Sequence, residues 1–125
     1  MKYLLMSYTP ASEWNAESAD TPSADAMAAF AEYQRIEAEM RETGELVTSE
    51  GLGHPAVSTT VQQIDGQVVA TDGPFAELKE VLASFAVVEC HSQERAVEIA
   101  ARIVSALGEP IEVRPIMGED FGIDV

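Results

Sequence analysis

The stretch VLASFAVVEC, residues 81–90, runs almost directly into SQERAVEIAARIVSAL, residues 92–107. The first part is a continuous apolar run, which is typical of a strand buried on both faces. The second part predicts a helix that Ser92 caps and that Gly108 and Pro110 end. Its apolar residues recur every three or four positions and form one stripe: Ala96, Ile99, Ala100, Ile103 and Leu107. This unit predicts a helix packed on a sheet.

Similar signals lie upstream of this unit. Residues 2–8 predict a first strand, and residues 11–20 predict a loop in which Trp14 is either the anchor or part of a binding rim. Thr21 and Pro22 predict the start of a helix that continues to Gly44. The apolar stripe of this helix consists of Met27, Phe30, Tyr33, Ile36 and Met40.

The remaining segments predict strands. ELVTSEGL, residues 45–52, contains a short strand, and residues 58–73 contain two β-rich runs joined at Asp65-Gly66, the commonest hairpin signal. IEVRPIM, residues 111–117, is the last strand, and residues 118–125 form a short tail. The order is strand, helix, strand, inserted hairpin, strand, helix, strand. It predicts one domain over residues 1–125 with an α+β, ferredoxin-like sandwich, whose antiparallel sheet carries both helices on one face.

Apolar residues occupy both parities of residues 82–90, so we expect the second sheet face to be covered as well. A second copy of the chain is the simplest cover. The sequence therefore predicts a homodimer in which two sheets face each other, a dimeric α+β barrel.

Composition excludes several function classes. The 125 residues include 22 acidic and 7 basic ones, a net charge of -15, which opposes binding to nucleic acids and to anionic membranes. No apolar run approaches the length of a membrane span, and the N-terminus lacks the features of a signal peptide. A single cysteine, Cys90, cannot form an internal disulfide. We therefore expect a cytoplasmic protein.

TDGPFAELKE, residues 71–80, places a carboxylate beside a Gly-Pro turn. Asp72 has two roles open to it: it caps the turn through backbone N–H groups, or it is a general base at the rim of an apolar cavity. His54, in the glycine-rich connection before Pro55, is the histidine that can approach this turn and is the second candidate catalytic residue. Phe75 either fills the core or contacts a ligand.

Three further residues are candidates for substrate binding. Glu50 ends a strand near the expected cavity mouth, Arg114 is the basic group expected at the sheet, and Tyr8 could supply a phenol. Each of them has a structural alternative, a solvated strand end, a surface ion pair or a core tyrosine. No metal-ligand spacing, phosphate-binding fingerprint or serine-hydrolase elbow is present, so we expect neither a metal nor a cofactor.

EGLGHPAVSTTV (residues 50–61), TDGPFAELKE and EVRPIM (residues 112–117), after an N-terminal MKYLLMSY, resemble the YCII-related proteins of the DGPF type, a family of small bacterial proteins. The resemblance covers residues 1–117 and implies a dimeric ferredoxin-like α+β barrel. It also implies a His and Asp pair, in which Asp72 matches the family motif and His54 is the nearby histidine. Where many relatives carry a GGYY-like run, this chain has residues 82–86 as LASFA.

Two function hypotheses follow. By analogy of fold, the first is a pocket for a small molecule with proton-transfer, isomerase or lyase chemistry. The second is a non-catalytic ligand-sensing or regulatory protein, because the resemblance implies genes that lie beside those of alternative sigma factors. An acidic surface would suit docking on a basic protein partner.

Overall fold

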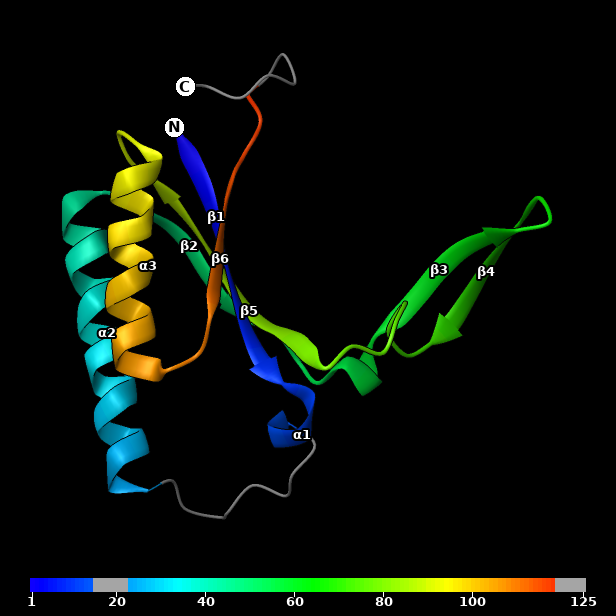
Figure 1. Ribbon diagram of the computed structural model, residues 1–125. Helices are drawn as coiled ribbons and strands as arrows, with labels where there is room; N and C mark the ends of the chain where they lie inside the picture. Colours follow the sequence, from blue (N-terminus) through cyan, green and yellow to red (C-terminus); the bar gives the residue numbers. More distant parts are fainter. Residues whose placement is uncertain (15–22, 119–125) are drawn as a thin grey trace.

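The computed structural model describes residues 1–14 and 23–118, except for the side chain of Trp14. Its centre is a four-stranded sheet with the order β2-β5-β1-β6, in which every pairing is antiparallel. The strands are β1 (Lys2–Pro10), β2 (Leu46–Gly51), β5 (Glu80–Glu89) and β6 (Ile111–Pro115). The helices α2 (Ala24–Thr43) and α3 (Gln93–Leu107) lie side by side on one face (Figure 1). The architecture is α+β and agrees with the predicted ferredoxin-like arrangement.

Both long helices begin and end at local signals in the sequence. The hydroxyl of Ser23 accepts a hydrogen bond from the Ala26 N–H at 3.0 Å, and that of Ser92 accepts one from the Arg95 N–H at 3.1 Å. Gly44 ends α2 in the left-handed region, where a residue without Cβ is least strained. The predicted cap at Thr21 lies outside the described residues, and the described α2 begins at Ala24.

The predicted loop over residues 11–20 was wrong at its start, since Ala11–Trp14 forms a one-turn helix, α1. The Ala11 N–H donates to the Lys79 carbonyl at 2.7 Å, which holds α1 against the start of β5. The rest of the predicted loop, residues 15–20, lies outside the described residues.

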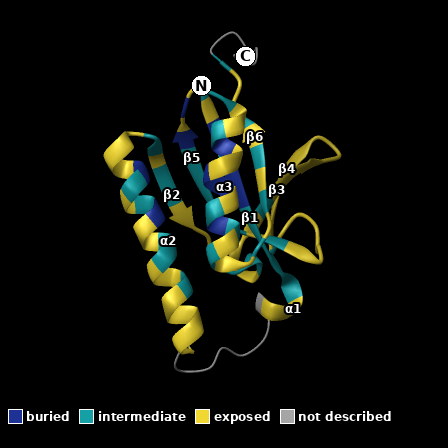
Figure 2. Cartoon of the chain, turned by 60° about the vertical axis from the view of Figure 1, so that its left-hand side comes forward, coloured by how far each residue is buried: buried dark blue, intermediate teal, exposed yellow. Residues whose placement is uncertain are grey.

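The core lies between the helices and the upper half of the sheet (Figure 2). Tyr3, Leu5 and Val88 point inward from the two central strands, and Ile36 and Ile99 meet them from α2 and α3. All five side chains are buried. Burial of such side chains stabilises the fold by about 1.5–3 kcal/mol each, which explains why the predicted stripes form helices here.

The N-terminal part of α2 lies beyond this core. Met27 and Phe30 belong to the predicted apolar stripe, but they are 60% and 55% exposed, whereas Ile36 and Met40 are buried. The helix therefore extends past the sheet-covered part of the core, and an open space remains beneath its first turns.

The inserted hairpin is confirmed. β3 (Thr59–Ile64) pairs with β4 (Gln67–Asp72) through a two-residue turn, in which Asp65 and Gly66 have φ values of 51° and 81°. The hairpin projects away from the sheet (Figure 1), and nearly all its residues are exposed. Two strands without a packed face are only marginally stable in water, so the hairpin depends on its base for its position.

The segment that returns from the hairpin corrects one expectation. Residues 77 and 78 are irregular, and Glu80 begins β5. Phe75, which was one candidate for filling the core, is 78% exposed. Phe75 follows Gly73 and Pro74 in an irregular segment, where its ring faces solvent and does not reach the helices.

The face of the sheet opposite the helices is apolar along its two central strands. Antiparallel register places Leu4 opposite Val87 and Met6 opposite Phe85, and alternation directs these side chains away from the helices. Tyr8 follows on the same face. In the described chain no helix covers this face (Figure 1).

Candidate functional site

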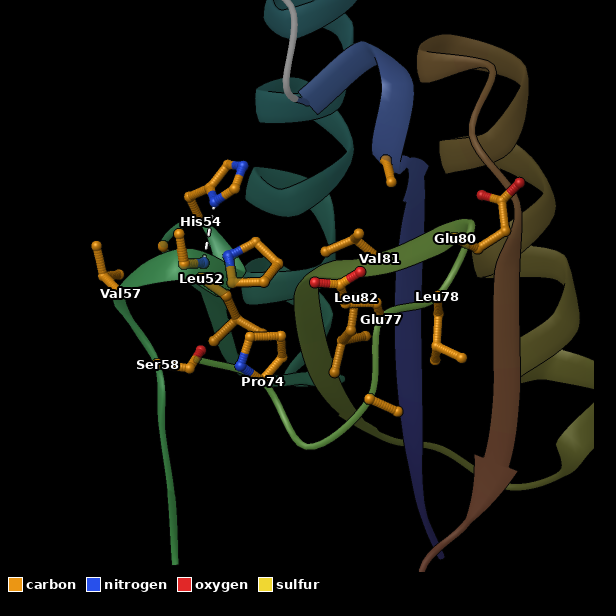
Figure 3. Close-up of a pocket in the computed structure, with 15 residues that line it drawn as sticks. Leu52, His54, Val57, Ser58, Pro74, Glu77, Leu78, Glu80, Val81 and Leu82 are labelled. Carbon is orange, nitrogen blue, oxygen red and sulfur yellow. Dashed lines mark hydrogen bonds between the residues drawn. The ribbon is translucent and has the colours of Figure 1, made fainter. Parts of the chain in front are cut away.

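A cavity of about 650 Å³ lies at the base of the hairpin (Figure 3). One wall is the segment 52–58, which leads from β2 through the short 3₁₀ helix η1 (Pro55–Val57) into β3. The other wall is the returning segment, with Pro74, Glu77 and Leu78, together with the start of β5. The two connections of the hairpin thus form the two sides of the cavity.

Backbone hydrogen bonds hold the two walls together. The Gly73 N–H donates to the Ser58 carbonyl at 2.7 Å, and the Thr60 hydroxyl donates to the Gly73 carbonyl at 2.8 Å. Gly73 has a φ of +106°, a conformation that L side chains rarely adopt. The glycine is therefore needed to turn the chain back toward the sheet and to close the cavity at this end.

His54 lines the first wall and is half-buried. Its Nδ1 accepts a hydrogen bond from the Ala56 N–H at 3.0 Å, which also caps η1 (Figure 3). In a neutral imidazole whose Nδ1 is an acceptor, Nε2 carries the hydrogen. The local structure thus orients His54 as a donor through Nε2.

Two carboxylates line the opposite wall, those of Glu77 and Glu80. The Glu77 carboxylate points across the cavity toward the segment that carries His54, whereas Glu80 lies at the far side, where β5 begins (Figure 3). The described residues that line the cavity include no Lys or Arg. An anionic ligand would therefore meet repulsion without a compensating cation.

The rest of the lining is apolar and exposed. Leu78 and Val57 are 67% and 79% exposed, and Leu52 and Leu82 border the same space. Exposed apolar groups gathered around a concave surface are typical of a binding site. The cavity combines a ring donor, a facing carboxylate and apolar walls, which suits a neutral organic molecule with one polar group.

Comparison with known proteins identifies the chain. Residues 1–120 match the family model of the YCII-related domain. The chain belongs to this family. It is 32% identical over 77 residues to an uncharacterised protein of Rhizobium meliloti (strain 1021), and the alignment covers 60% of this chain and 62% of that relative. YCII-related membership agrees with the resemblance seen in the sequence.

Asp72, the residue that the YCII-related resemblance singled out, lies at the end of β4 opposite Thr59. It is exposed and is not among the described residues that line the cavity. Among the described residues its carboxylate accepts no hydrogen bond, and the backbone of Gly73 holds the turn instead. His54 lies in the segment that enters the hairpin, whereas Asp72 ends the returning strand β4, so the two residues of the YCII-related motif do not share the cavity. A catalytic role for Asp72 stays a prediction.

The structure places the predicted substrate-binding residues apart from one another. Glu50 and Arg114 lie on β2 and β6, the two edge strands of the sheet. Glu50 accepts a hydrogen bond from the Thr48 hydroxyl at 3.2 Å, and Arg114 pairs with Glu112 at 2.6 Å.

Tyr8 and Phe75 also lie outside the cavity lining as described. The Tyr8 hydroxyl contacts the Met6 sulfur at 3.8 Å on the face that the helices leave open. Phe75 is adjacent to the wall residue Pro74 but is directed away from the core, as its exposure shows. Their roles in substrate binding stay predictions.

Glu77 and Leu52 were missed as site residues. A run of charged residues such as 77–80 is more often a solvated surface than a site, and this pattern conceals Glu77. A usable signal was present: Pro74 prevents a regular continuation of β4, so the returning chain must run beside the segment that enters the hairpin. His54 lies between Gly53 and Pro55, and Glu77 lies three residues after Pro74.

Within residues 1–14 and 23–118, no three His, Cys, Asp or Glu side chains gather where a metal ion could be held. None of the described helices is both long enough and apolar enough to cross a membrane.

Proposed function

We propose that the cavity at the base of the hairpin binds a small, neutral carbonyl compound and promotes proton transfer next to its carbonyl group. The observation that supports this function is the placement of His54 and Glu77 on opposite walls of one apolar-lined cavity. The proposed reaction class is isomerisation, with Glu77 as general base and His54 as hydrogen-bond donor.

The chemistry follows from the two groups. Glu77 removes a proton from the carbon next to the carbonyl, and the electron pair moves into an enolate whose oxygen accepts a hydrogen bond from His54. The protonated Glu77 then returns the proton to the carbon two positions further along the conjugated system. No electron is gained or lost, and no co-reactant is needed.

The absence of Lys and Arg among the described lining residues supports a neutral substrate. The exposed side chains of Leu78 and Val57 would lose contact with water when an apolar body fills the cavity. Each apolar Å² removed from water contributes about 25 cal/mol, so such a ligand would gain affinity from these side chains without ionic contacts.

α-Angelica lactone tests this function, because proton transfer converts it into the conjugated β-isomer. Proton NMR in D₂O follows both the isomer ratio and deuterium uptake. We expect turnover by the wild-type protein and a loss of about 100-fold or more in Glu77→Gln, since general-base catalysis typically contributes at least that much. His54→Gln should lower the rate while lactone-induced shifts still appear in residues 52–58.

Glu89→Gln is the matched control, because Glu89 lies at the other end of β5, is exposed and is not among the described lining residues. It removes the same charge and should keep the wild-type rate. Asp72→Asn decides between the two carboxylates. A large loss in Asp72→Asn together with a normal rate in Glu77→Gln would assign the base to Asp72, and absence of lactone turnover by the wild type would contradict this substrate class.

A homodimer is part of the proposal. The described helices leave uncovered the apolar sheet face formed by Leu4, Met6, Tyr8, Phe85 and Val87, and a second copy offers a face of the same shape and polarity. Covering this face would also exclude water near β5, which borders the cavity.

A second candidate function is a regulatory one, supported by the acidic surface. The net charge of -15 favours association with a basic protein and disfavours association with acidic ones. Reversal of surface carboxylates such as Glu94 and Glu98 would then weaken partner binding, whereas Glu77→Gln would leave it unchanged. The opposite pattern would favour the catalytic function.

A further inference from the structure

The inward face of the sheet changes character halfway along the strands. Near the core, register aligns Tyr3 with Val88 and Leu5 with Ala86, all of them apolar or aromatic. The next aligned pair on the same face is Ser7 with Ser84. A face covered by two helices would be more stable with apolar groups throughout. Hydroxyl groups at these two positions therefore suggest a role other than stabilising the core, such as binding a ligand.

A second cavity, of about 430 Å³, lies over these serines. Phe30 and Tyr33 of α2 border it on one side, and Ile103 and Leu107 of α3 border it on the other. The small residues beneath and the exposed start of α2 above leave this space unfilled. It is separate from the cavity at the hairpin base, because the Leu52 N–H donates to the Ala83 carbonyl at 2.9 Å where the two meet.

One side of this cavity carries a chain of hydrogen bonds. The Tyr33 hydroxyl lies 2.9 Å from the Ser49 hydroxyl, which donates to Glu37 Oε1 at 3.2 Å, and Arg41 pairs with Glu37 Oε2 at 3.0 Å. Burial raises the pKa of the Tyr33 phenol, and the nearby Glu37 carboxylate raises it further. The phenol therefore stays protonated at neutral pH, and this side of the cavity is polar.

The other side carries an acid without a cationic partner. Glu109 is half-buried, lines the cavity and accepts a hydrogen bond from the Thr9 hydroxyl. Among the described residues it forms no ion pair, in contrast to Glu37. No Lys, Arg or His is found among the described residues that line this cavity. Its charge is thus available to a ligand.

We propose that this second cavity binds a small organic ammonium ion. The ammonium group pairs with Glu109 and donates to the hydroxyl row of Ser7 and Ser84, since an ammonium has three donors and these groups supply acceptors. The apolar part of the ligand contacts the side chains of Phe30 and Leu107. The inference stands apart from the proposed isomerase function, because it uses none of the residues of the first cavity.

Three physical arguments select a cation over other ligands. Carboxylates repel carboxylic acids and phosphates, and the lining described here offers no compensating positive charge. The aromatic rings of Phe30 and Tyr33 lie 6.2 Å apart at the cavity border and attract cations through their π faces. The net charge of -15 raises the local concentration of cations around the whole protein.

Three probes of similar shape test the proposal: phenethylamine, which is cationic, 2-phenylethanol, which is neutral, and phenylacetate, which is anionic. Their dissociation constants for the wild-type protein come from amide chemical shifts in ¹H–¹⁵N NMR spectra. We expect phenethylamine to bind at least about tenfold more tightly than the alcohol, because charge-assisted hydrogen bonds are the stronger ones. The shifts should map to residues around Ser7, Ser84 and Glu109, and phenylacetate should not bind.

Glu109→Gln and Glu112→Gln are matched variants. Both remove one charge within the same short stretch. Glu112, however, pairs with Arg114, and alternation along β6 directs it to the face opposite that of the cavity-lining Ile111. We expect Glu109→Gln to weaken phenethylamine binding about tenfold or more and Glu112→Gln to change it less than about twofold. Equal weakening in both variants, equal affinity of the wild type for amine and alcohol, or shifts confined to residues 52–58 and 74–82 would each overturn the proposal.

Discussion

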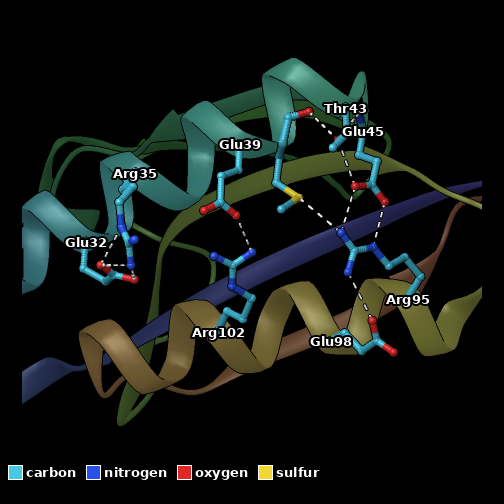
Figure 4. Close-up of polar contacts among 9 residues, drawn as sticks. Glu32, Arg35, Glu39, Thr43, Glu45, Arg95, Glu98 and Arg102 are labelled. Atoms are coloured by element: carbon cyan, nitrogen blue, oxygen red, sulfur yellow. Dashed lines mark hydrogen bonds and ion pairs between the residues drawn. The ribbon is translucent and has the colours of Figure 1, made fainter.

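Glu45 and Arg95 join the end of α2 to the start of α3. Arg95 Nε donates to Glu45 Oε2 at 2.9 Å and Nη2 donates to Oε1 at 3.0 Å, so the two planar groups meet side by side (Figure 4). The side chains are only 16% and 25% exposed. This pair lowers the pKa of Glu45 from its ordinary value of 4.5 to about 2. The chief cause is the hydrogen bonding by Arg95, which outweighs the opposing effect of burial.

Removal of this carboxylate should destabilise the fold in a pH-dependent way. Because the folded pKa lies below the unfolded one, the stabilisation is complete above about pH 5 and disappears as the pH falls toward 2. We expect Glu45→Gln to lower the free energy of unfolding by about 2 kcal/mol at pH 7, allowing for partial screening by water, and by much less at pH 2. Urea unfolding of both proteins at several pH values measures this difference.

Glu98→Gln is the control for this prediction. Glu98 contacts the same Arg95 at 3.1 Å, but its side chain is 65% exposed. Exposed ion pairs contribute about 0–1 kcal/mol, so the variant should be close to wild type at every pH. Equal effects of the two substitutions would show that Glu45 has no special contribution.

The contact between the helices and the sheet gives a second prediction. Ile99 of α3 is 1% exposed and packs in the core cluster with Leu5 and Ile36. Ile99→Ala should lower the free energy of unfolding by about 2–5 kcal/mol, because it removes buried methyl groups and leaves a cavity. Val97→Ala on the same helix is the comparison, since Val97 is 49% exposed. Thermal or urea unfolding measures both variants. An equal loss in the free energy of unfolding would contradict the assigned core.

Local signals predicted most of the fold. The periodic apolar residues of α3, the Asp65-Gly66 turn and Gly44 and Gly108 all act within a few residues, and the structure confirms each of them. The irregular path of residues 73–79 was not predictable in the same way. It depends on contacts between segments far apart in the sequence, such as the hydrogen bond from Gly73 to Ser58.

The candidate site was only partly predictable for the same reason. His54 lines the cavity together with Pro74 of the turn, and its catalytic role stays a prediction. Glu77 lies across the cavity from His54, and the sequence separation of the two conceals this relationship. Arg114 was a candidate for substrate binding, but it forms an ion pair with Glu112 of its own strand at 2.6 Å.

Substitution of Gly73 gives a third prediction. No atom lies within 4 Å of a Cβ placed there, so the cost of Gly73→Ala comes from backbone strain at φ +106° and not from a clash. We expect the returning segment to shift and the first cavity to lose ligand binding, while the melting temperature of the sheet and helices changes little. NMR shifts should then change around residues 52–58 and 74–82 and stay constant in α3.

Gly66→Ala at the hairpin tip is the control, because Gly66 has a similarly positive φ far from the cavity. Normal lactone binding by Gly73→Ala would contradict a closing role for this turn.

Association of two chains through the apolar sheet face gives the last prediction. Val87 lies at the centre of this face, opposite Leu4 and beside Phe85, so Val87→Asp would place a charge in the proposed interface. Each chain carries a net charge of -15, so the two copies also repel each other, and added salt screens this repulsion. We therefore expect the wild type to sediment as a dimer at micromolar concentration, with tighter association at 0.5 M than at 0.05 M NaCl, and Val87→Asp to sediment as a folded monomer. Val97→Asp, on the exposed side of α3, adds the same charge and should stay dimeric. A wild-type protein that is monomeric at both salt concentrations would rule out this interface, and loss of the dimer in both variants would place the interface elsewhere.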